Sequence, residues 1–289
     1  MEIILSTLIT LSLLGLVSAI ILYFVAQKFK VFEDPRIDDV AAFTPGANCG
    51  GCGYPGCRGF AEACVNAENL DNMFCPAGGN ETMKNIANVL GLTAVEKAPQ
   101  IAVVRCNGTH EKRRKTSVYD GPNSCAVSHA LYSGDTDCPY GCLGLGDCVV
   151  VCKFDAIYID EESGLPMVDE QKCTACNACA KACPKSIIEI RLKGKKSRRI
   201  YVSCINKDKG AEAKRACDSA CIACNKCVKT CAFDAITVDN FCAYIDAEKC
   251  SLCRKCVQEC PTGAILELNF PARKDTSAKT SVEVTEVEN

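Results

Sequence analysis

Cys173-Thr-Ala-Cys176-Asn-Ala-Cys179-Ala-Lys-Ala-Cys183-Pro184 is the stretch of sequence that decides the fold of this chain. Its cysteines follow the spacing C-x2-C-x2-C-x3-C, with which thiolates hold [4Fe–4S] clusters. Three thiols two residues apart can surround one cluster, whereas the fourth points away and ligates the cluster of a partner run. The stretch therefore predicts a unit built around inorganic clusters, in which cysteine runs occur in pairs.

Sixteen cysteines form four such runs, and three of the runs keep this spacing without deviation. Exchange of the fourth ligand, as in bacterial ferredoxins, predicts four sites. They are Cys173, Cys176, Cys179 with Cys152; Cys138, Cys142, Cys148 with Cys183; Cys221, Cys224, Cys227 with Cys260; and Cys250, Cys253, Cys256 with Cys231. Two tandem 2[4Fe–4S] ferredoxin modules follow from this pairing.

The two modules repeat one another. The segment 152–160, CKFDAIYID, matches the segment 231–239, CAFDAITVD, and the segments 172–190 and 249–268 also correspond. We expect one duplicated unit, in which a short helix from each cysteine run leads into a strand of a small antiparallel sheet.

The run that begins at Cys138 departs from the rule, because its first two gaps contain three and five residues. Gly141, Gly144 and Gly146 lie in these gaps. The glycines could suggest a nucleotide-binding loop, but no strand–glycine–helix context surrounds them. We interpret them as allowing close approach to a cluster, in a longer loop whose altered N–H···S pattern would change the potential of that cluster.

A fifth site is predicted nearer the N-terminus, in Cys49-Gly-Gly-Cys52-Gly-Tyr-Pro-Gly-Cys57, with Cys75 as the fourth ligand. Glycines let this backbone fold tightly and direct amide groups at sulfur. Cys64 is expected to be a buried structural thiol. A zinc knuckle is the alternative for this segment.

Six cysteines remain: Cys64, Cys106, Cys125, Cys204, Cys217 and Cys242. Cys106, Cys125, Cys204 and Cys217 flank the first module and could converge on a sixth cluster. No spacing rule supports that grouping, and a free buried cysteine behaves as a small apolar residue. The sequence thus predicts five clusters and leaves a sixth open.

The cysteine content of 26 among 289 residues would also suit a disulfide scaffold or a set of zinc sites. Cysteines three apart rarely reach disulfide geometry with each other. Zinc sites favour separated ligand pairs, commonly with histidine, and this chain has only two histidines. Thiols kept for iron imply a reducing compartment.

One transmembrane helix is predicted at the N-terminus, because residues 3–27 are apolar and uncharged. A cleaved signal peptide would begin with basic residues, whereas here Lys28 and Lys30 follow the apolar run. The positive-inside rule then predicts a single-pass protein of the inner (cytoplasmic) membrane, with its cluster domains on the cytoplasmic side.

The expected fold class is α+β, and the expected organisation has eight parts. They are a transmembrane helix (1–27), a tether (28–43), a four-cysteine [4Fe–4S] domain with a helix near 81–96 that stops at Gly91 (44–100), a connector with a strand at 101–104 (101–135), ferredoxin module 1 (136–190), a basic connector (191–219), ferredoxin module 2 (220–268) and a disordered tail (269–289).

Basic residues are concentrated in the second connector, from Lys193 to Arg215. They form either a solvated surface or a docking surface for a small acidic electron carrier. Nothing else resembles a nucleic-acid-reading motif, so no nucleic acid is expected as a partner.

The transmembrane start, the Cys49–Cys57/Cys75 motif and the run CPYGCLGLGDC at 138–148, in this order, resemble the B subunit of the Rnf complex in its longer, two-module form. The resemblance covers nearly the whole chain before the tail. It implies a membrane complex that couples electron flow between reduced ferredoxin and NAD+ to Na+ or H+ translocation. Reduced ferredoxin would be the electron donor, and other Rnf subunits would carry the flavin and NAD sites.

In that function the chain is an electron-transfer subunit of a translocase and carries no catalytic residue of its own. One alternative keeps the relay but ends it at a redox-sensing transcription factor. Another is a corrinoid-associated iron–sulfur protein, since the Cys49–Cys75 motif also looks like cluster domains of that class. The apolar N-terminus and the lack of a barrel-length domain count against the corrinoid alternative.

Overall fold

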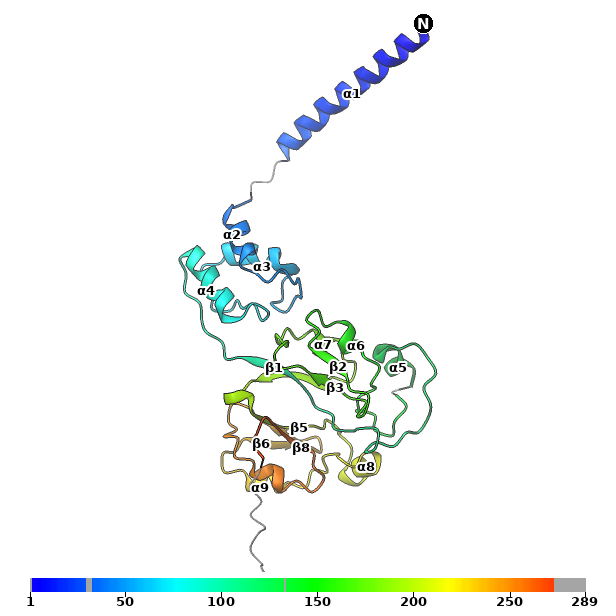
Figure 1. Cartoon of the computed structure of the whole chain (residues 1–289), viewed down its shortest axis with the longest axis vertical. Coiled ribbons are helices and arrows are strands. Elements are labelled where there is room, and N and C mark those ends of the chain that lie inside the picture. The colour runs from blue at the N-terminus through cyan, green and yellow to red at the C-terminus, as the bar shows by residue number, and fades with distance from the viewer. Residues whose placement is uncertain (1, 30–32, 133, 273–289) are drawn as a thin grey trace, which may run out of the picture.

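The computed structural model describes residues 2–29, 33–132 and 134–272. Helix α1 (Glu2–Lys28) stands apart from the rest of the chain, and a small helical domain lies between it and the strand-containing modules (Figure 1). Part of the predicted tether (30–32) and most of the predicted tail (273–289) lie outside the described residues.

Helix α1 has the length and composition of a membrane span. The candidate span Ile4–Lys28 has a mean hydropathy of 2.5 and none of it is buried. Its 25 residues extend about 37 Å, enough to cross a hydrocarbon core of about 30 Å. The hydroxyls of Thr10 and Ser18 donate to carbonyls of the same helix, Ser6 and Leu14, so these polar groups are satisfied internally.

The four-cysteine domain is built from α2 (Arg36–Ala42), α3 (Gly56–Val65) and α4 (Gly79–Leu90). Val40, Phe60 and Ile86 meet in its core. The predicted helix near 81–96 is α4, and it ends where predicted, at Gly91, whose φ of 68° is in the left-handed region that glycine favours at a helix end. Cys64 is fully buried in the same core, as expected of a structural thiol.

Four two-stranded antiparallel sheets organise the rest of the described chain. In module 1, β1 (Gln100–Val104) pairs with β4 (Ile188–Leu192), and β2 (Ile157–Ile159) pairs with β3 (Pro166–Val168). In module 2, β5 (Arg199–Val202) pairs with β8 (Ile265–Leu268), and β6 (Ile236–Asp239) pairs with β7 (Cys242–Ile245). The two modules therefore share one topology.

Strands β1 and β5 belong to segments that the sequence suggested were connectors. Strand β1 pairs with β4, the last strand of module 1, in a register that begins with Gln100↔Leu192. Strand β5 pairs with β8, the last strand of module 2, in a register that begins with Arg199↔Leu268. Each sheet therefore includes a strand that precedes the predicted start of its module, which was residue 136 for module 1 and residue 220 for module 2. Between β1 and the cysteine loop that begins at Cys142, module 1 contains an insertion, which carries α5 (Cys125–Tyr132).

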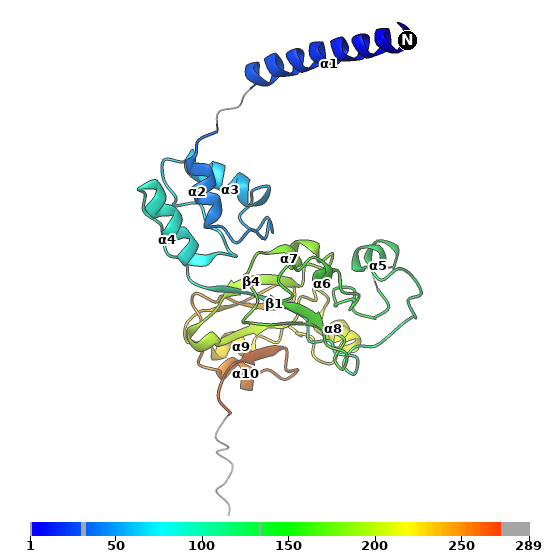
Figure 2. The same cartoon turned by 45° about the horizontal axis from the view of Figure 1, so that its top comes forward.

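Short helices follow the cysteine loops. They are α6 (Asp147–Val150), α7 (Ala178–Ala182), α9 (Lys226–Thr230) and α10 (Lys255–Gln258); η1 (Lys195–Ser197) and α8 (Gly210–Ala216) lie in the basic connector. The repeat extends to the backbone, because Asn177 and Arg254 precede equivalent helices with the same φ of 68°. Figure 2 shows α9 and α10 on module 2 and α6 and α7 on module 1.

The two modules pack sheet against sheet. Alternation along β1 sends Ala102 and Val104 into the core of module 1. Ile101 and Val103 face the other way, where they join Tyr201 of β5 in a separate apolar cluster. Leu266 and Leu268 of β8 pack against this cluster, which we call the inter-module layer.

Candidate iron–sulfur sites

Two of the predicted four-cysteine groups line cavities together, as expected. Cys152, Cys173, Cys176 and Cys179 line one cavity, of about 350 Å³ including its open mouth. Cys221, Cys224, Cys227 and Cys260 line the other, of about 360 Å³. Backbone amides donate to ligand sulfurs in both, from Ala156 to Cys152 Sγ and from Ala243 to Cys221 Sγ, each at 3.4 Å.

The predicted second site of module 2 consists of Cys250, Cys253, Cys256 and Cys231. Burial, and after it the neighbouring thiols, raise the pKa of Cys256 to about 12. The thiols that contribute are those of Cys250, Cys253 and Cys231 and that of Cys227 from the neighbouring site, so Cys256 lies within electrostatic reach of all of them.

In the four-cysteine domain, Cys75 lies close to Cys52 and Cys49. Burial raises the pKa of Cys75, while the amide of Gly78, 3.4 Å from Cys75 Sγ, acts in the opposite direction. The amide of Cys57 donates to Asn48 Oδ1 at 2.8 Å, which fixes the glycine-rich loop.

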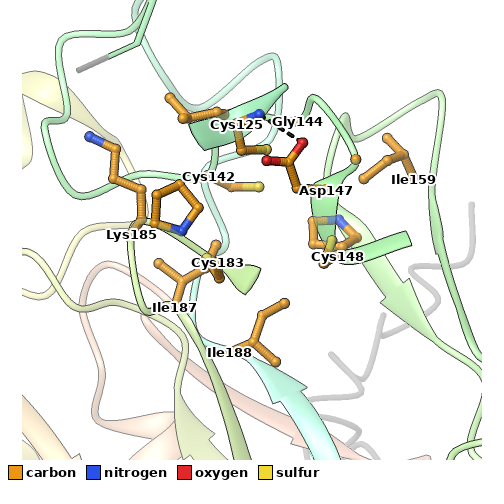
Figure 3. Close-up of a pocket in the computed structure, with 14 residues that line it drawn as sticks. Cys125, Cys142, Gly144, Asp147, Cys148, Ile159, Cys183, Lys185, Ile187 and Ile188 are labelled. Atoms are coloured by element: carbon orange, nitrogen blue, oxygen red, sulfur yellow. Dashed lines mark hydrogen bonds between the residues drawn. The ribbon is translucent and has the colours of Figure 1, made fainter. Parts of the chain in front are cut away.

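A third cavity differs from the prediction. Cys142, Cys148 and Cys183 converge in it, but the fourth thiol belongs to Cys125 (Figure 3). This cavity, of about 360 Å³, matches the two regular ferredoxin-type cavities in size. Cys138, which the spacing placed here, instead lines another cavity with Cys106, Cys204 and Cys217.

A signal for this arrangement exists in the sequence. The gaps Cys142-x2-Leu145-x2-Cys148-x3-Cys152 reproduce the ferredoxin spacing, with Leu145 in place of the middle cysteine. The backbone agrees, because Gly144 and Gly146 have φ of 73° and 84°, and the equivalent Ala175 and Asn177 of the regular run have 56° and 68°. Cys125 therefore lies at the cavity in which this run supplies one cysteine fewer than a regular run.

Asp147 holds Cys125 at the cavity. Its carboxylate accepts the backbone N–H groups of Cys125 and Ala126, each at 2.9 Å, and the hydroxyl of Ser124 at 3.1 Å. These bonds satisfy the first amides of α5 and tie that helix to the residue before Cys148. A single carboxylate thus couples the insertion to the cysteine loop.

Burial dominates the electrostatics of these thiols. It raises the pKa of Cys148 to about 12 and that of Cys179 to about 11. Burial therefore favours the protonated form of these two thiols, and iron has to displace their protons when it binds.

The thiols of the candidate sites can be compared with those of a mononuclear zinc site. Four thiolates on one zinc ion lie about 3.8 Å apart, because each Zn–S bond is about 2.3 Å. Among the described residues, no three His, Cys, Asp or Glu side chains are grouped tightly enough for a single ion. The thiols are instead spread around cavities of several hundred cubic ångströms, as a four-iron cluster requires.

The four-cysteine domain touches module 1 at Cys176, one of the predicted ligands. A Cβ added to Gly51 would lie 2.9 Å from Cβ of Cys176 and 3.0 Å from its backbone, so only glycine fits there. Lys153 of module 1 donates to the carbonyl of Asn48 at 3.0 Å. The loop that carries Cys49 and Cys52 therefore lies directly against the Cys152/Cys173/Cys176/Cys179 site.

Three family models match the chain. One described as "Putative Fe-S cluster" covers residues 45–76, one described as "4Fe-4S dicluster domain" covers 137–187, and one described as "4Fe-4S binding domain" covers 243–266. Together with the apolar first helix, they confirm the predicted fold class.

Several curated proteins are similar over most of the chain. The B subunit of the Na(+)-translocating ferredoxin:NAD(+) oxidoreductase complex of Acetobacterium woodii is 45% identical over 240 residues, which are 83% of this chain and 71% of the relative. The B subunit of the ion-translocating oxidoreductase complex of Methanosarcina acetivorans is 39% identical, over 86% of this chain and 92% of the relative. The B subunit of the proton-translocating ferredoxin:NAD(+) oxidoreductase complex of Clostridium ljungdahlii is 36% identical, over 86% and 87%.

These similarities confirm the resemblance that the cysteine motifs indicated. With its cluster domains and apolar helix, the chain is an iron–sulfur electron-transfer subunit, and it belongs to the family of B subunits of Rnf ion-translocating oxidoreductase complexes.

Proposed function

We propose that this chain accepts electrons from reduced ferredoxin and passes them toward NAD+ through partner subunits that carry flavin and NAD sites, in a membrane complex that moves Na+ or H+. When bound, each [4Fe–4S] cluster supplies a one-electron carrier. The chain's own residues bind these clusters, hold them in series and set their surroundings.

The contact between Gly51 and Cys176 is the observation that carries this proposal. It joins the four-cysteine domain, which follows the apolar helix, to the first of two packed ferredoxin modules. The chain thus has one end at the anchor and another that is free to meet a soluble donor. We infer that electrons enter at the modules and leave at the Cys49/Cys52/Cys57/Cys75 site.

Cysteine spacing, together with the cavities and neighbouring thiols described above, supports five ligand sets. We assign clusters to Cys49, Cys52, Cys57 and Cys75; to Cys125, Cys142, Cys148 and Cys183; to Cys152, Cys173, Cys176 and Cys179; to Cys221, Cys224, Cys227 and Cys260; and to Cys231, Cys250, Cys253 and Cys256. Lys28 after the apolar helix supports a cytoplasmic location for all of them.

Anaerobic purification of the complex tests the function. We expect a brown subunit with at least about 20 irons, signals of reduced [4Fe–4S] clusters in EPR after addition of reduced ferredoxin, and ferredoxin-dependent NAD+ reduction in sealed vesicles. A colourless, zinc-loaded subunit would refute the relay. Ferredoxin oxidation that reduces a transcription factor and no NAD+ would favour the alternative acceptor.

The basic connector gives a prediction about the donor. Arg199 is buried in an ion pair with Glu170 and is structural, whereas Lys207, Lys209 and Arg215 are exposed. If an acidic ferredoxin docks there, reversing the charge of Lys207 and Arg215 should slow its electron transfer roughly tenfold at low salt. The wild-type rate should itself fall as salt screens the encounter.

Stopped-flow reduction at several ionic strengths checks this. Lys84→Glu, in the four-cysteine domain, is the matched control and should keep the wild-type rate. A rate that ignores both salt and the connector charges would remove the docking surface.

A further inference from the structure

Four cysteines outside the ferredoxin-type groups meet at one place. Cys106 follows β1, Cys138 lies in the insertion, Cys204 follows β5 and Cys217 ends α8, and all four line one cavity. We propose that Cys106, Cys138, Cys204 and Cys217 hold a sixth [4Fe–4S] cluster. The proposal rests on the proposed function only for the kind of metal group bound.

The cavity has the dimensions of its neighbours. Its volume is about 290 Å³ including the open mouth, compared with about 350–360 Å³ for three of the ferredoxin-type sites. Gly108 faces into it, since a Cβ there would lie 3.5 Å from Cys217 Sγ and 3.6 Å from Cys106 Sγ. A side chain at this position would occupy space that the group between the sulfurs needs.

Hydrogen-bond donors are directed at the sulfurs, as in sites that hold thiolates. Asn206 is 1% exposed; its backbone amide donates to Cys204 Sγ and its Nδ2 donates to Cys138 Sγ, each at 3.4 Å. Asn206 Oδ1 accepts the amide of Asp208 at 2.6 Å, and this fixes which end of the side chain faces Cys138. Both donors of Asn206 would stabilise negative charge on these sulfurs when a metal group is bound.

Positive charge adjoins the cavity. Arg105, at one edge, donates from Nη2 to the carbonyl of Cys204 at 3.2 Å. Arg105 also pairs with Glu189 at 3.4 Å. A cubane with four thiolates carries a net charge of 2−, and the Arg105 guanidinium offsets part of the cost of burying it.

The position of this site indicates its purpose in the chain. On one side, the amide of Cys142 donates to Cys106 Sγ at 3.4 Å, so a ligand of module 1 contacts it directly. On the other, the thiol of Cys242 donates to the carbonyl of Cys204 at 3.2 Å, and the next residue, Ala243, bonds Cys221 of module 2. The sixth site therefore joins the two modules into one series.

Iron counting and native mass spectrometry of the anaerobically purified subunit test the proposal. We expect about 24 irons and 24 sulfides in the wild type, and about 20 of each in Cys204→Ala and Cys217→Ala. Cys64→Ala removes a buried thiol outside the six sites and should keep the wild-type count. EPR of the remaining clusters reports whether each variant is folded.

A wild type with about 20 irons would overturn the sixth site and leave the five-cluster relay intact. The same holds if Cys204→Ala retains the full wild-type count, or if the site contains zinc. A variant that loses all its iron has misfolded. In that case the iron count of the wild type, about 24 or about 20, decides whether the sixth site exists. A wild type without any iron would refute the proposed function itself.

Discussion

Replacing Cys57 by alanine should stop onward electron transfer to the membrane partners, while ferredoxin still reduces the two modules. The four-cysteine domain lies between the anchor helix and the modules, and its loop meets module 1 at Gly51 and Cys176. Loss of about four irons from this domain would break the series at its last position. The modules keep their own ligands, so their reduction should be unchanged.

Two measurements separate these effects: EPR of the subunit after mixing with reduced ferredoxin, and NAD+ reduction by the assembled complex. NAD+ reduction should fall to background in Cys57→Ala. Cys64→Ala is the control, because this thiol is buried in the same domain and is not among the predicted ligands. Continued NAD+ reduction without the Cys57 cluster would mean that electrons leave from a module.

Replacing Cys125 by alanine should remove one cluster from module 1, although no cysteine run contains this residue. The expected loss is about four irons, measured by iron counting of the purified subunit. Cys138→Ala should leave the Cys125 site intact, which distinguishes the observed grouping from the one that the spacing suggested.

Asp147 should matter for the same site without binding iron. In Asp147→Ala, the amides of Cys125 and Ala126 lose their acceptor and α5 is released from the cysteine loop. Losing the hydrogen bonds that hold a metal ligand in place typically weakens metal binding by about 10–100-fold, so we expect this cluster to be lost first during chelator challenge. Asp147→Asn, which keeps one acceptor oxygen, should partly restore it.

Asp160→Ala is the matched control, because Asp160 also accepts a backbone amide, from Ser163 at 2.9 Å, but in the β2–β3 turn. It should release iron at the wild-type rate. Equal release from the Asp147 and Asp160 variants would contradict the positioning role.

Local spacing made much of this fold predictable. Three thiols within seven residues can serve one cluster only in a narrow range of backbone conformations, so the runs at Cys173, Cys221 and Cys250 specify the loop, the helix and the paired site together. The apolar first helix and the stop at Gly91 were predictable for the same reason, because each depends on neighbouring residues alone.

The rest depends on contacts distant in sequence. Strand β1 pairs with β4 some ninety residues later, and neither strand marks its partner in the sequence. Cys125 takes the place expected for Cys138 because Leu145 replaces a ligand, and only the folded insertion determines which thiol reaches that position. The spacing Cys142-x2-Leu145-x2-Cys148 was the clue that this run lacks its middle cysteine. It becomes visible when Gly144 and Gly146 are aligned with the equivalent residues of the regular run, Ala175 and Asn177.

The inter-module layer limits how such a chain can be shortened. Ile101 and Val103 on one sheet and Tyr201 on the other are buried only because the duplicated units lie back to back. A protein with a single module would expose this apolar sheet face to water and would be prone to self-association. Polar substitutions on that face, or another polypeptide packed against it, would prevent this. The duplication therefore provides each module with a partner that buries the apolar face of its sheet.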